Sequence, residues 1–169
     1  MTTMNSGFTQ KYALIQLFEP VPEGTVYDWK DWPLHVTIAD VFAIDWDVPT
    51  MTQKLTDLLD TMQSVVATVQ DDTFFGENGG VRVALIERTD ELAKLHYDVV
   101  ELLEHGGWKP NSPEYSRAGF LPHSTVQKHA RLNRGDKVVF DALTLIDFFP
   151  GSDPYKRKVV KTIKLGSRL

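Results

Sequence analysis

The sequence contains Pro33-Leu34-His35-Val36-Thr37-Ile38 early in the chain and Phe120-Leu121-Pro122-His123-Ser124-Thr125-Val126 late in the chain. Both stretches place a histidine two residues before a threonine, in an apolar and strand-like setting. Successive side chains of a strand point to opposite faces, so each histidine shares a face with its threonine, while Val36, Ile38 and Val126 lie on the other face. If the two strands lie side by side, two imidazoles and two hydroxyls meet in one space.

Such a constellation suits the cleavage of a phosphodiester. In-line displacement at phosphorus needs a base for the attacking hydroxyl or water and an acid for the leaving alkoxide. An imidazole, with an unperturbed pKa of about 6.5, can serve as either, and each proton transfer contributes typically about 10² to 10⁴ in rate. His35 and His123 are therefore the candidate catalytic residues, with the assignment of acid and base left open. Thr37 and Thr125 are the candidates to bind the non-bridging phosphate oxygens.

The two motifs resemble those of the two-histidine (2H) phosphoesterase superfamily, which includes cyclic phosphodiesterases and proteins like the 2′-5′ RNA ligases. Its defining feature is a pair of His-x-Thr/Ser-x motifs in the two halves of a pseudo-duplicated fold. Here both are complete, as His35-Val36-Thr37-Ile38 and His123-Ser124-Thr125-Val126. The resemblance extends from about Tyr12 to Leu165. It implies a bilobal α+β fold in which mainly antiparallel sheets form a central cleft, with helices on the outside, and it implies the same roles for the four motif side chains.

We therefore expect a metal-independent phosphodiesterase that hydrolyses a 2′,3′-cyclic phosphate, a 2′,5′-linked oligonucleotide or a small cyclic (oligo)nucleotide. The alternative is a non-catalytic nucleotide-binding module or sensor that keeps the same pocket. The intact histidines and threonines favour the enzyme. In well-known bacterial members the second motif commonly continues into a Leu-Ala-Arg-like sequence, whereas Val126-Gln127-Lys128 follows here, so the resemblance does not carry over an arginine contact and RNA ligase activity is not assumed.

Composition is in keeping with this reading. The 169 residues, 42% of them hydrophobic, can bury the core of one bilobal domain spanning residues 1–169, with flexible termini over about 1–10 and 166–169. The net charge of -5 argues against extensive duplex binding, so a nucleotide or short oligonucleotide is the expected partner. The absence of cysteine excludes disulfides and thiolate catalysis. No His-Glu-x-x-His or Cys-x-x-Cys pattern is present, and we predict no metal and no cofactor.

Targeting signals are not evident in the sequence. The opening residues lack both a basic segment and an apolar core of signal-peptide length, and no apolar run approaches about 18 residues. We expect a soluble, cytoplasmic monomer with no membrane association.

The order of expected elements also predicts an α+β domain with largely antiparallel sheet. Strands are expected over residues 12–18, through the first motif to about 39, and over 64–69, 81–86 and 123–126, with 73–76 as a strand or turn and 138–149 paired with 156–165. Thr50 is expected to cap one helix, which carries Leu55, Leu58, Leu59 and Met62. Thr89 should begin a second helix that ends near Gly106-Gly107, and residues 108–117 should form a loop.

Several further side chains are candidates to contact substrate, although aromatic residues at such places more often serve packing. Aromatic residues could stack on a base, and basic residues beside the second motif could contact phosphate. The aromatic candidates are Tyr12, Trp32, Tyr115 and Phe149, and the basic candidates are Arg117 and Lys128. His129 could border the pocket, whereas His96 and His105 are expected to be structural or surface residues.

Overall fold

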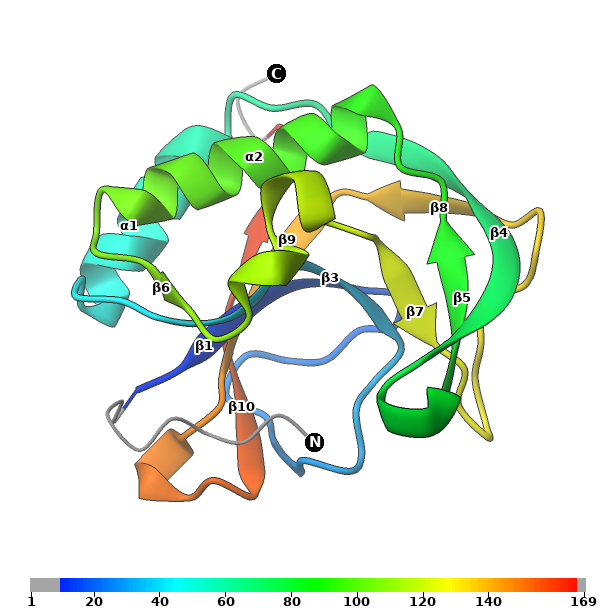
Figure 1. Ribbon diagram of the computed structural model, residues 1–169. Coiled ribbons are helices and arrows are strands. Elements are labelled where there is room, and N and C mark those ends of the chain that lie inside the picture. The colour runs from blue at the N-terminus through cyan, green and yellow to red at the C-terminus, as the bar shows by residue number, and fades with distance from the viewer. Residues whose placement is uncertain (1–9, 167–169) are drawn as a thin grey trace.

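The computed structural model of the protein describes residues 10–166 and confirms an α+β fold (Figure 1). The flexible ends expected over about 1–10 and 166–169 lie almost wholly outside the described residues. The helices are α1 (Val48–Leu59) and α2 (Asp90–Glu104). The strands are β1 (Tyr12–Leu17), β2 (Val26–Asp28), β3 (His35–Ala43), β4 (Val65–Phe75), β5 (Val81–Ile86), β6 (Lys109–Pro110), β7 (His123–Thr125), β8 (Lys137–Phe140), β9 (Ala142–Asp147) and β10 (Lys156–Lys164).

The strands form two sheets, and the pairings within them are antiparallel. A six-stranded sheet has the order β2-β10-β9-β1-β3-β6, and a four-stranded sheet has the order β7-β5-β4-β8. The first motif begins β3 in the larger sheet, and the second motif forms β7 in the smaller one. Each sheet thus carries one motif strand, as the bilobal prediction requires.

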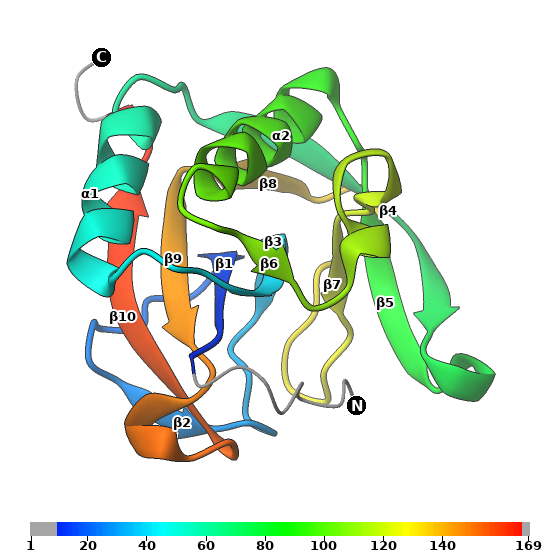
Figure 2. The same cartoon turned by 60° about the vertical axis from the view of Figure 1, so that its left-hand side comes forward.

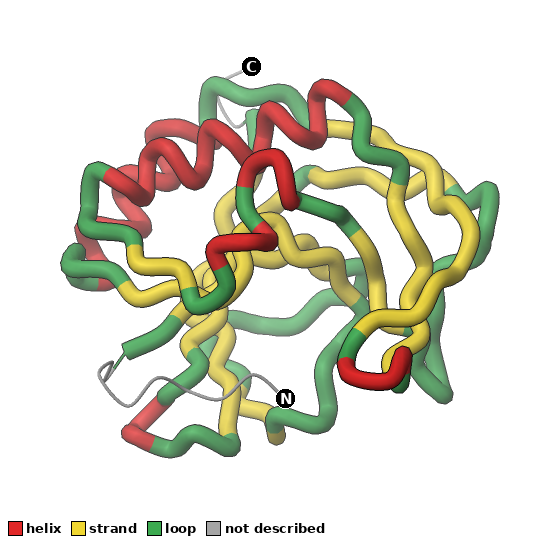
Figure 3. Tube along the Cα trace, in the orientation of Figure 1, coloured by secondary structure: helices red, strands yellow, loops and turns green. Residues whose placement is uncertain are grey.

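The two α-helices lie together on one side of the molecule (Figures 1 and 3). α1 packs against β10, while α2 packs against β3 and β4 and so touches strands of both sheets. The main apolar core lies beneath these helices and includes Leu55 and Leu59 of α1 and Leu92, Leu95 and Val99 of α2. The opposite face of the larger sheet carries a smaller apolar cluster around Ile15, Ile146 and Val159. Because the helices cover the outer side, the sides of the two sheets that face each other remain available for a site.

The helix starts test the capping predictions. Thr89 caps α2 as predicted, since its Oγ1 accepts a hydrogen bond from the Leu92 N–H at 3.0 Å. The prediction for α1 was wrong, because Asp47 is its cap and its carboxylate accepts from the Thr50 N–H at 2.8 Å. The proline in the first turn fits this earlier start, because proline needs no hydrogen-bond acceptor there. α1 ends before Met62, which packs against the core from the following loop.

Several predicted strand boundaries were also wrong. The segments 64–69 and 73–76 belong to one strand, β4, whose pairing with β5 is interrupted between Val69 and Asp72. The polar residues at this irregularity look like a strand end in the sequence although the strand continues. The segment 138–149 is divided at Asp141 into β8 and β9, which belong to different sheets. The segment 108–117, which was expected as a loop, contains the short strand β6, and the short strand β2 was not predicted. Figure 2 shows the β4–β5 hairpin extending beyond the helices.

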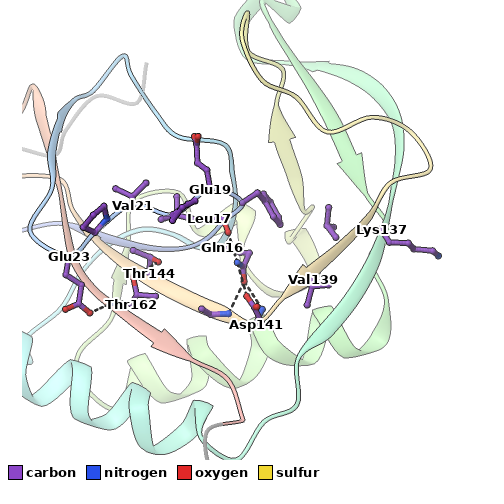
Figure 4. Close-up of a pocket in the computed structure, with 15 residues that line it drawn as sticks. Gln16, Leu17, Glu19, Val21, Glu23, Lys137, Val139, Asp141, Thr144 and Thr162 are labelled. Carbon is purple, nitrogen blue, oxygen red and sulfur yellow. Dashed lines mark hydrogen bonds between the residues drawn. The ribbon is translucent and has the colours of Figure 1, made fainter.

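The buried side-chain amide of Gln16 stabilises the chain where it passes from β8 in the smaller sheet to β9 in the larger sheet. Gln16 of β1 is 4% exposed, and its Oε1 accepts hydrogen bonds from the N–H groups of Asp141 at 2.8 Å and Ala142 at 3.0 Å. Its Nε2 donates to the Leu17 carbonyl at 2.7 Å. These groups lie at a cavity of about 960 Å³ between the end of β1, residues 18–23 and β8 (Figure 4). Gln16 thus fixes the start of β9 relative to β8.

We expect Gln16→Leu to lower the free energy of unfolding by about 2 kcal/mol, because it leaves two backbone N–H groups without their acceptor at nearly constant side-chain volume. Equilibrium unfolding in urea measures this loss. Gln63→Leu, at an exposed position between α1 and β4, is the matched control and should leave the unfolding midpoint unchanged. If Gln16→Leu is as stable as the parent protein, water must be able to replace the amide.

Candidate active site

The two motif strands come together although they belong to different sheets. β3 and β7 lie against each other, with His35 and His123 each at the first position of its strand. Val36 and Ile38 are buried in the core, as the alternation of a strand predicts. Ser124 is buried as well, at 2% exposure. The opposite face of each strand, which carries the histidine, therefore faces the space between the sheets.

A cavity of about 910 Å³ occupies this space, and His35, Thr37 and Thr125 line it. His123 is close by, because it lies on the same face of β7 as Thr125, two residues along, and β7 packs against β3. Ala13 and Ile15 of β1 contribute apolar lining, and further residues come from the loops before β3 and after β7. The structure therefore places the four motif residues in or beside one cavity.

Each of the two histidines makes an equivalent hydrogen bond to a backbone carbonyl. His35 Nδ1 lies 2.8 Å from the Pro33 carbonyl oxygen, and His123 Nδ1 lies 2.7 Å from the Leu121 carbonyl oxygen. A carbonyl oxygen only accepts, so Nδ1 carries the proton in each ring, and Nε2 of the neutral imidazole is left as an acceptor. In both motifs the carbonyl belongs to the residue two positions upstream. The two rings are thus fixed in the same tautomer by equivalent local geometry.

Aromatic side chains pack against both imidazoles. The Trp32 ring lies 4.8 Å from the His35 ring at an interplanar angle of 33°, and the Phe75 ring meets His123 edge to face at 4.7 Å. Trp32 also packs on Phe148 at 5.5 Å, and both of these side chains line the cavity. Trp32 was a predicted candidate, whereas Phe75 and Phe148 were not. The neighbouring residue Phe149 was expected instead, but it precedes a 3₁₀ turn over Pro150–Ser152.

His35 is half-buried, and its surroundings shift its protonation equilibrium. Removal of His35 from water lowers its pKa, the hydrogen bond to the Pro33 carbonyl opposes this shift, and the charge of His123 adds to it. A pKa below the ordinary value keeps the imidazole neutral at neutral pH. His35 is therefore available as a proton acceptor through Nε2.

The loop after β7 brings a predicted basic residue to the cavity. Lys128 and His129 both line it, together with Gln127. Gln127 Nε2 donates a hydrogen bond to the Trp32 carbonyl at 2.8 Å, which joins this loop to the loop before β3. Arg131 further fixes the loop through paired hydrogen bonds to the Asp72 carboxylate at 3.0 and 2.7 Å. The cavity wall is thus built from both halves of the chain.

The other candidates lie elsewhere. Tyr12 is 5% exposed, and its ring packs on Phe42 on the face of β1 opposite to the cavity-lining Ala13. Tyr115 is 57% exposed in the short turn Pro113–Tyr115. Arg117 pairs with a carboxylate of α2 and lies over the ring of Trp108. The structure thus gathers Trp32 and Lys128 at the cavity and leaves these three residues outside it.

His96 is a core residue that needs its neutral form. Its Nδ1 lies 2.6 Å from the Ile38 carbonyl oxygen, and its Nε2 accepts from the Arg117 N–H at 2.8 Å. The ring stacks on Phe120 with a centroid distance of 4.1 Å. Burial lowers the pKa of His96, the hydrogen bond to Ile38 opposes the shift, and nearby guanidinium groups add to it. The contact ties β3 to the segment that leads into the second motif.

We expect folding stability to fall as the pH drops below about 6.5. The folded pKa of His96 lies below the unfolded value, so in that range the unfolded chain binds a proton that the folded chain does not. The slope from one such group reaches at most about 1.4 kcal/mol per pH unit, and His35 acts with the same sign. Urea unfolding of His96→Gln between pH 5 and 8 should give a flatter profile, with a constant difference from the parent above pH 7. A slope equal to that of the parent would contradict the assignment.

Antiparallel sheets that each present one His-x-Thr strand to a shared cavity define the class of two-histidine phosphoesterases. The chain belongs to the 2′-5′ RNA ligase superfamily, whose family model matches residues 15–149, and this confirms the resemblance stated above. The family supports an enzyme of the phosphodiesterase type in general.

Known structures share the fold. The crystal structure of a phosphoesterase is 15% identical over 94% of this chain and 99% of that chain, with a TM-score of 0.55. The structure of LigT from E. coli complexed with NADP+ is 14% identical over 93% of this chain and 98% of that chain, with a TM-score of 0.50. At these identities the likeness concerns the fold alone. No curated protein matches this chain in sequence.

Two further observations concern residues 10–166. No three side chains among the histidines, aspartates and glutamates of this range are grouped so that they could hold a metal ion. Neither α-helix in this range is long and apolar enough to span a membrane.

Proposed function

We propose that the protein is a metal-independent phosphodiesterase that hydrolyses a 2′,3′-cyclic phosphate, a 2′,5′-linked oligonucleotide or a small cyclic (oligo)nucleotide. The observation that carries the proposal is the matched pair of imidazoles. His35 and His123 make equivalent Nδ1 hydrogen bonds to a carbonyl, which leaves Nε2 of each ring as the acceptor, and they lie on two strands that pack against each other. Thr37 and Thr125 belong to the same wall and supply hydroxyl donors.

The reaction follows from these groups. With the phosphate held by Thr37 and Thr125, one histidine takes a proton from the attacking water at Nε2 while the new P–O bond forms. The other histidine, protonated, donates its Nε2 proton to the ribose oxygen as the opposite P–O bond breaks. The two histidines exchange protonation states in the step and return to the starting state through solvent. Hydroxyl donors stabilise the charge that develops on the non-bridging oxygens.

The cavity supports a nucleotide as the substrate. Trp32 and Phe148 give it an aromatic wall on which a base can stack. Lys30 and Lys128 supply positive charge from the loops of the two halves. The structure of E. coli LigT with NADP+, which shares the fold, also contains a nucleotide ligand. A net charge of -5 favours a short substrate over folded RNA.

An assay in the presence of EDTA tests the proposal. The panel contains 2′,3′-cyclic mononucleotides, 2′,5′-oligoadenylate, and cyclic dinucleotides and trinucleotides with 3′,5′ or mixed linkages. We expect at least one of these classes to be hydrolysed. If the folded protein binds a cyclic nucleotide tightly and forms no product over long incubation, the proposal is wrong and the chain is a binding module.

A further inference from the structure

One side-chain hydrogen bond joins the loop before β3 to the loop after β7. Gln127 Nε2 donates to the Trp32 carbonyl at 2.8 Å, and both residues are half-buried and line the cavity that contains the motif residues. Within residues 10–166 it is the one hydrogen bond between these two loops. Trp32 lies three residues before His35, and Gln127 lies two residues after Thr125. The bond therefore lies at the end of the cavity where β3 begins and β7 ends.

Each of the two loops is also held within its own half of the chain. The Trp32 ring packs on the rings of Tyr27 and Phe148, with a centroid distance of 5.5 Å in both pairs. In the other loop, the Gln127 N–H donates to the Ala130 carbonyl at 3.1 Å, so the chain turns there. The bond from Gln127 to Trp32 thus connects two ordered loops and fixes the distance between the halves at this end. Its loss should leave each loop folded.

The other end of the cavity carries a carboxylate. Asp40 and Val41 are the lining residues that lie furthest from Trp32 along β3. On β1, the successive residues Ile15, Leu14 and Tyr12 pair with Thr37, Ala39 and Phe42 of β3. β3 thus holds one extra residue in each interval, which is the pattern of two β-bulges, and they turn Asp40, which regular alternation from Val36 would bury, into the cavity. A polyanionic chain that leaves by this end passes the Asp40 carboxylate.

Positive charge lies beside the bond between the loops. Lys30 precedes Trp32 by two residues and Lys128 follows Gln127 directly, and both lysines are exposed and line the cavity, as does Asp31 between Lys30 and Trp32. The two ammonium groups would attract every additional phosphate of a longer substrate. Charge alone therefore favours a long nucleotide chain at this end, and a preference for a short ligand must come from the bond that joins the loops.

We propose that Gln127 is a specificity-determining residue that closes this end of the cavity, so that the protein takes a nucleotide that ends within the cavity and not a strand that runs through it. The inference rests on the phosphodiesterase function proposed above and narrows its substrate to a 2′,3′-cyclic mononucleotide or a small cyclic nucleotide. The volume of about 910 Å³ is that of a small-molecule site, for which about 300–1,000 Å³ is typical. A continuing chain has to separate the two loops and break the hydrogen bond from Gln127 to Trp32.

Calorimetric titration of the full chain with two probes tests the inference. The probes are 3′-AMP and the adenosine tetranucleotide that ends in the same 3′-phosphate. We expect the parent protein to bind the tetranucleotide no more tightly than 3′-AMP. In Gln127→Ala the tetranucleotide should bind about tenfold more tightly than in the parent, because its further phosphates reach Lys30 and Lys128, while the Kd of 3′-AMP should change by less than about twofold. Tighter binding of the tetranucleotide than of 3′-AMP by the parent would overturn the inference.

A second variant separates the hydrogen bond from the volume of the side chain. Methionine is similar to glutamine in length and has no N–H to donate, so Gln127→Met should shift the ratio of the two Kd values in the same direction as Gln127→Ala. If Gln127→Met binds both probes as the parent does, the hydrogen bond does not close the cavity and the inference is wrong. Gln63→Ala, at an exposed position between α1 and β4, is the control and should leave both Kd values unchanged.

These measurements also separate this inference from the proposed function. The comparison of the two probes on the parent protein needs no variant, so it can overturn the inference even if the Gln127 variants fold poorly. Binding needs no turnover. A parent protein that prefers 3′-AMP and hydrolyses nothing in the panel would support the closed cavity and contradict the phosphodiesterase. A parent protein that hydrolyses a substrate of the panel and binds the tetranucleotide more tightly would do the reverse.

Discussion

His35→Ala and His123→Ala should each lower kcat/KM by about 10² to 10⁴, because each removes one of the two groups that transfer a proton in the same step. The double variant should lose little more than the worse of the single variants, since groups that act as a unit are not additive. Initial rates on the best substrate of the panel measure the effect. His105→Ala, at an exposed position at the end of α2, is the control and should retain the parent rate.

A change of leaving group separates the two roles. A p-nitrophenyl ester of the same nucleotide releases a stable phenolate and needs no protonation, so the variant that lacks the general acid should recover most of its rate on that substrate. The variant that lacks the general base should remain impaired, because the attacking water still needs a base, so the comparison assigns the two roles. If both variants recover equally, neither histidine is the specific acid. If neither variant loses activity on any substrate, the two-histidine mechanism is wrong.

The parts of the site that could be predicted from the sequence depend on local geometry. His35 and Thr37 share a face because three consecutive residues of one strand alternate. The same alternation buries Val36 and Ile38. Trp32 could be predicted because it lies three residues before the first histidine, where the chain can fold back so that the indole packs on the imidazole of His35.

The missed residues depend on pairing between distant segments. Asp40 is turned into the cavity by bulges that arise only where β3 pairs with β1, and regular alternation from Thr37 predicts the wrong face. Phe75 reaches His123 because β4 continues through its irregular pairing with β5, which the sequence does not reveal. Tyr12 illustrates the reverse error, because the neighbouring Ala13 is the residue that faces the cavity.

The separation of β8 from β9 was missed for a similar reason. The segment 138–149 is apolar throughout most of its length and reads as one strand. Its division at Asp141 is stabilised from outside, by hydrogen bonds from the N–H groups of Asp141 and Ala142 to the amide of Gln16. Gln16 lies in the first strand of the chain, so no local pattern could indicate the crossover.

Thr37→Val and Thr125→Val should each reduce kcat by about 10² to 10³, because each removes a hydroxyl that would donate to a phosphate oxygen as charge develops there. Valine keeps the shape and β-branching of threonine, so the strands should remain folded. Single-turnover rates at saturating substrate measure the chemical step. The loss should appear in kcat more than in KM, since the hydrogen bond strengthens in the transition state.

The second motif offers its own control for this prediction. Ser124 lies between His123 and Thr125 but points to the buried face, and among the described residues no hydrogen-bond partner reaches its Oγ. Ser124→Ala therefore removes a hydroxyl from the same strand without touching the cavity. It should leave kcat unchanged and leave stability equal or slightly higher, because an unsatisfied buried hydroxyl is costly. If Ser124→Ala impairs turnover as much as Thr125→Val does, the effect comes from packing of β7, and the proposed phosphate contact of Thr125 is wrong.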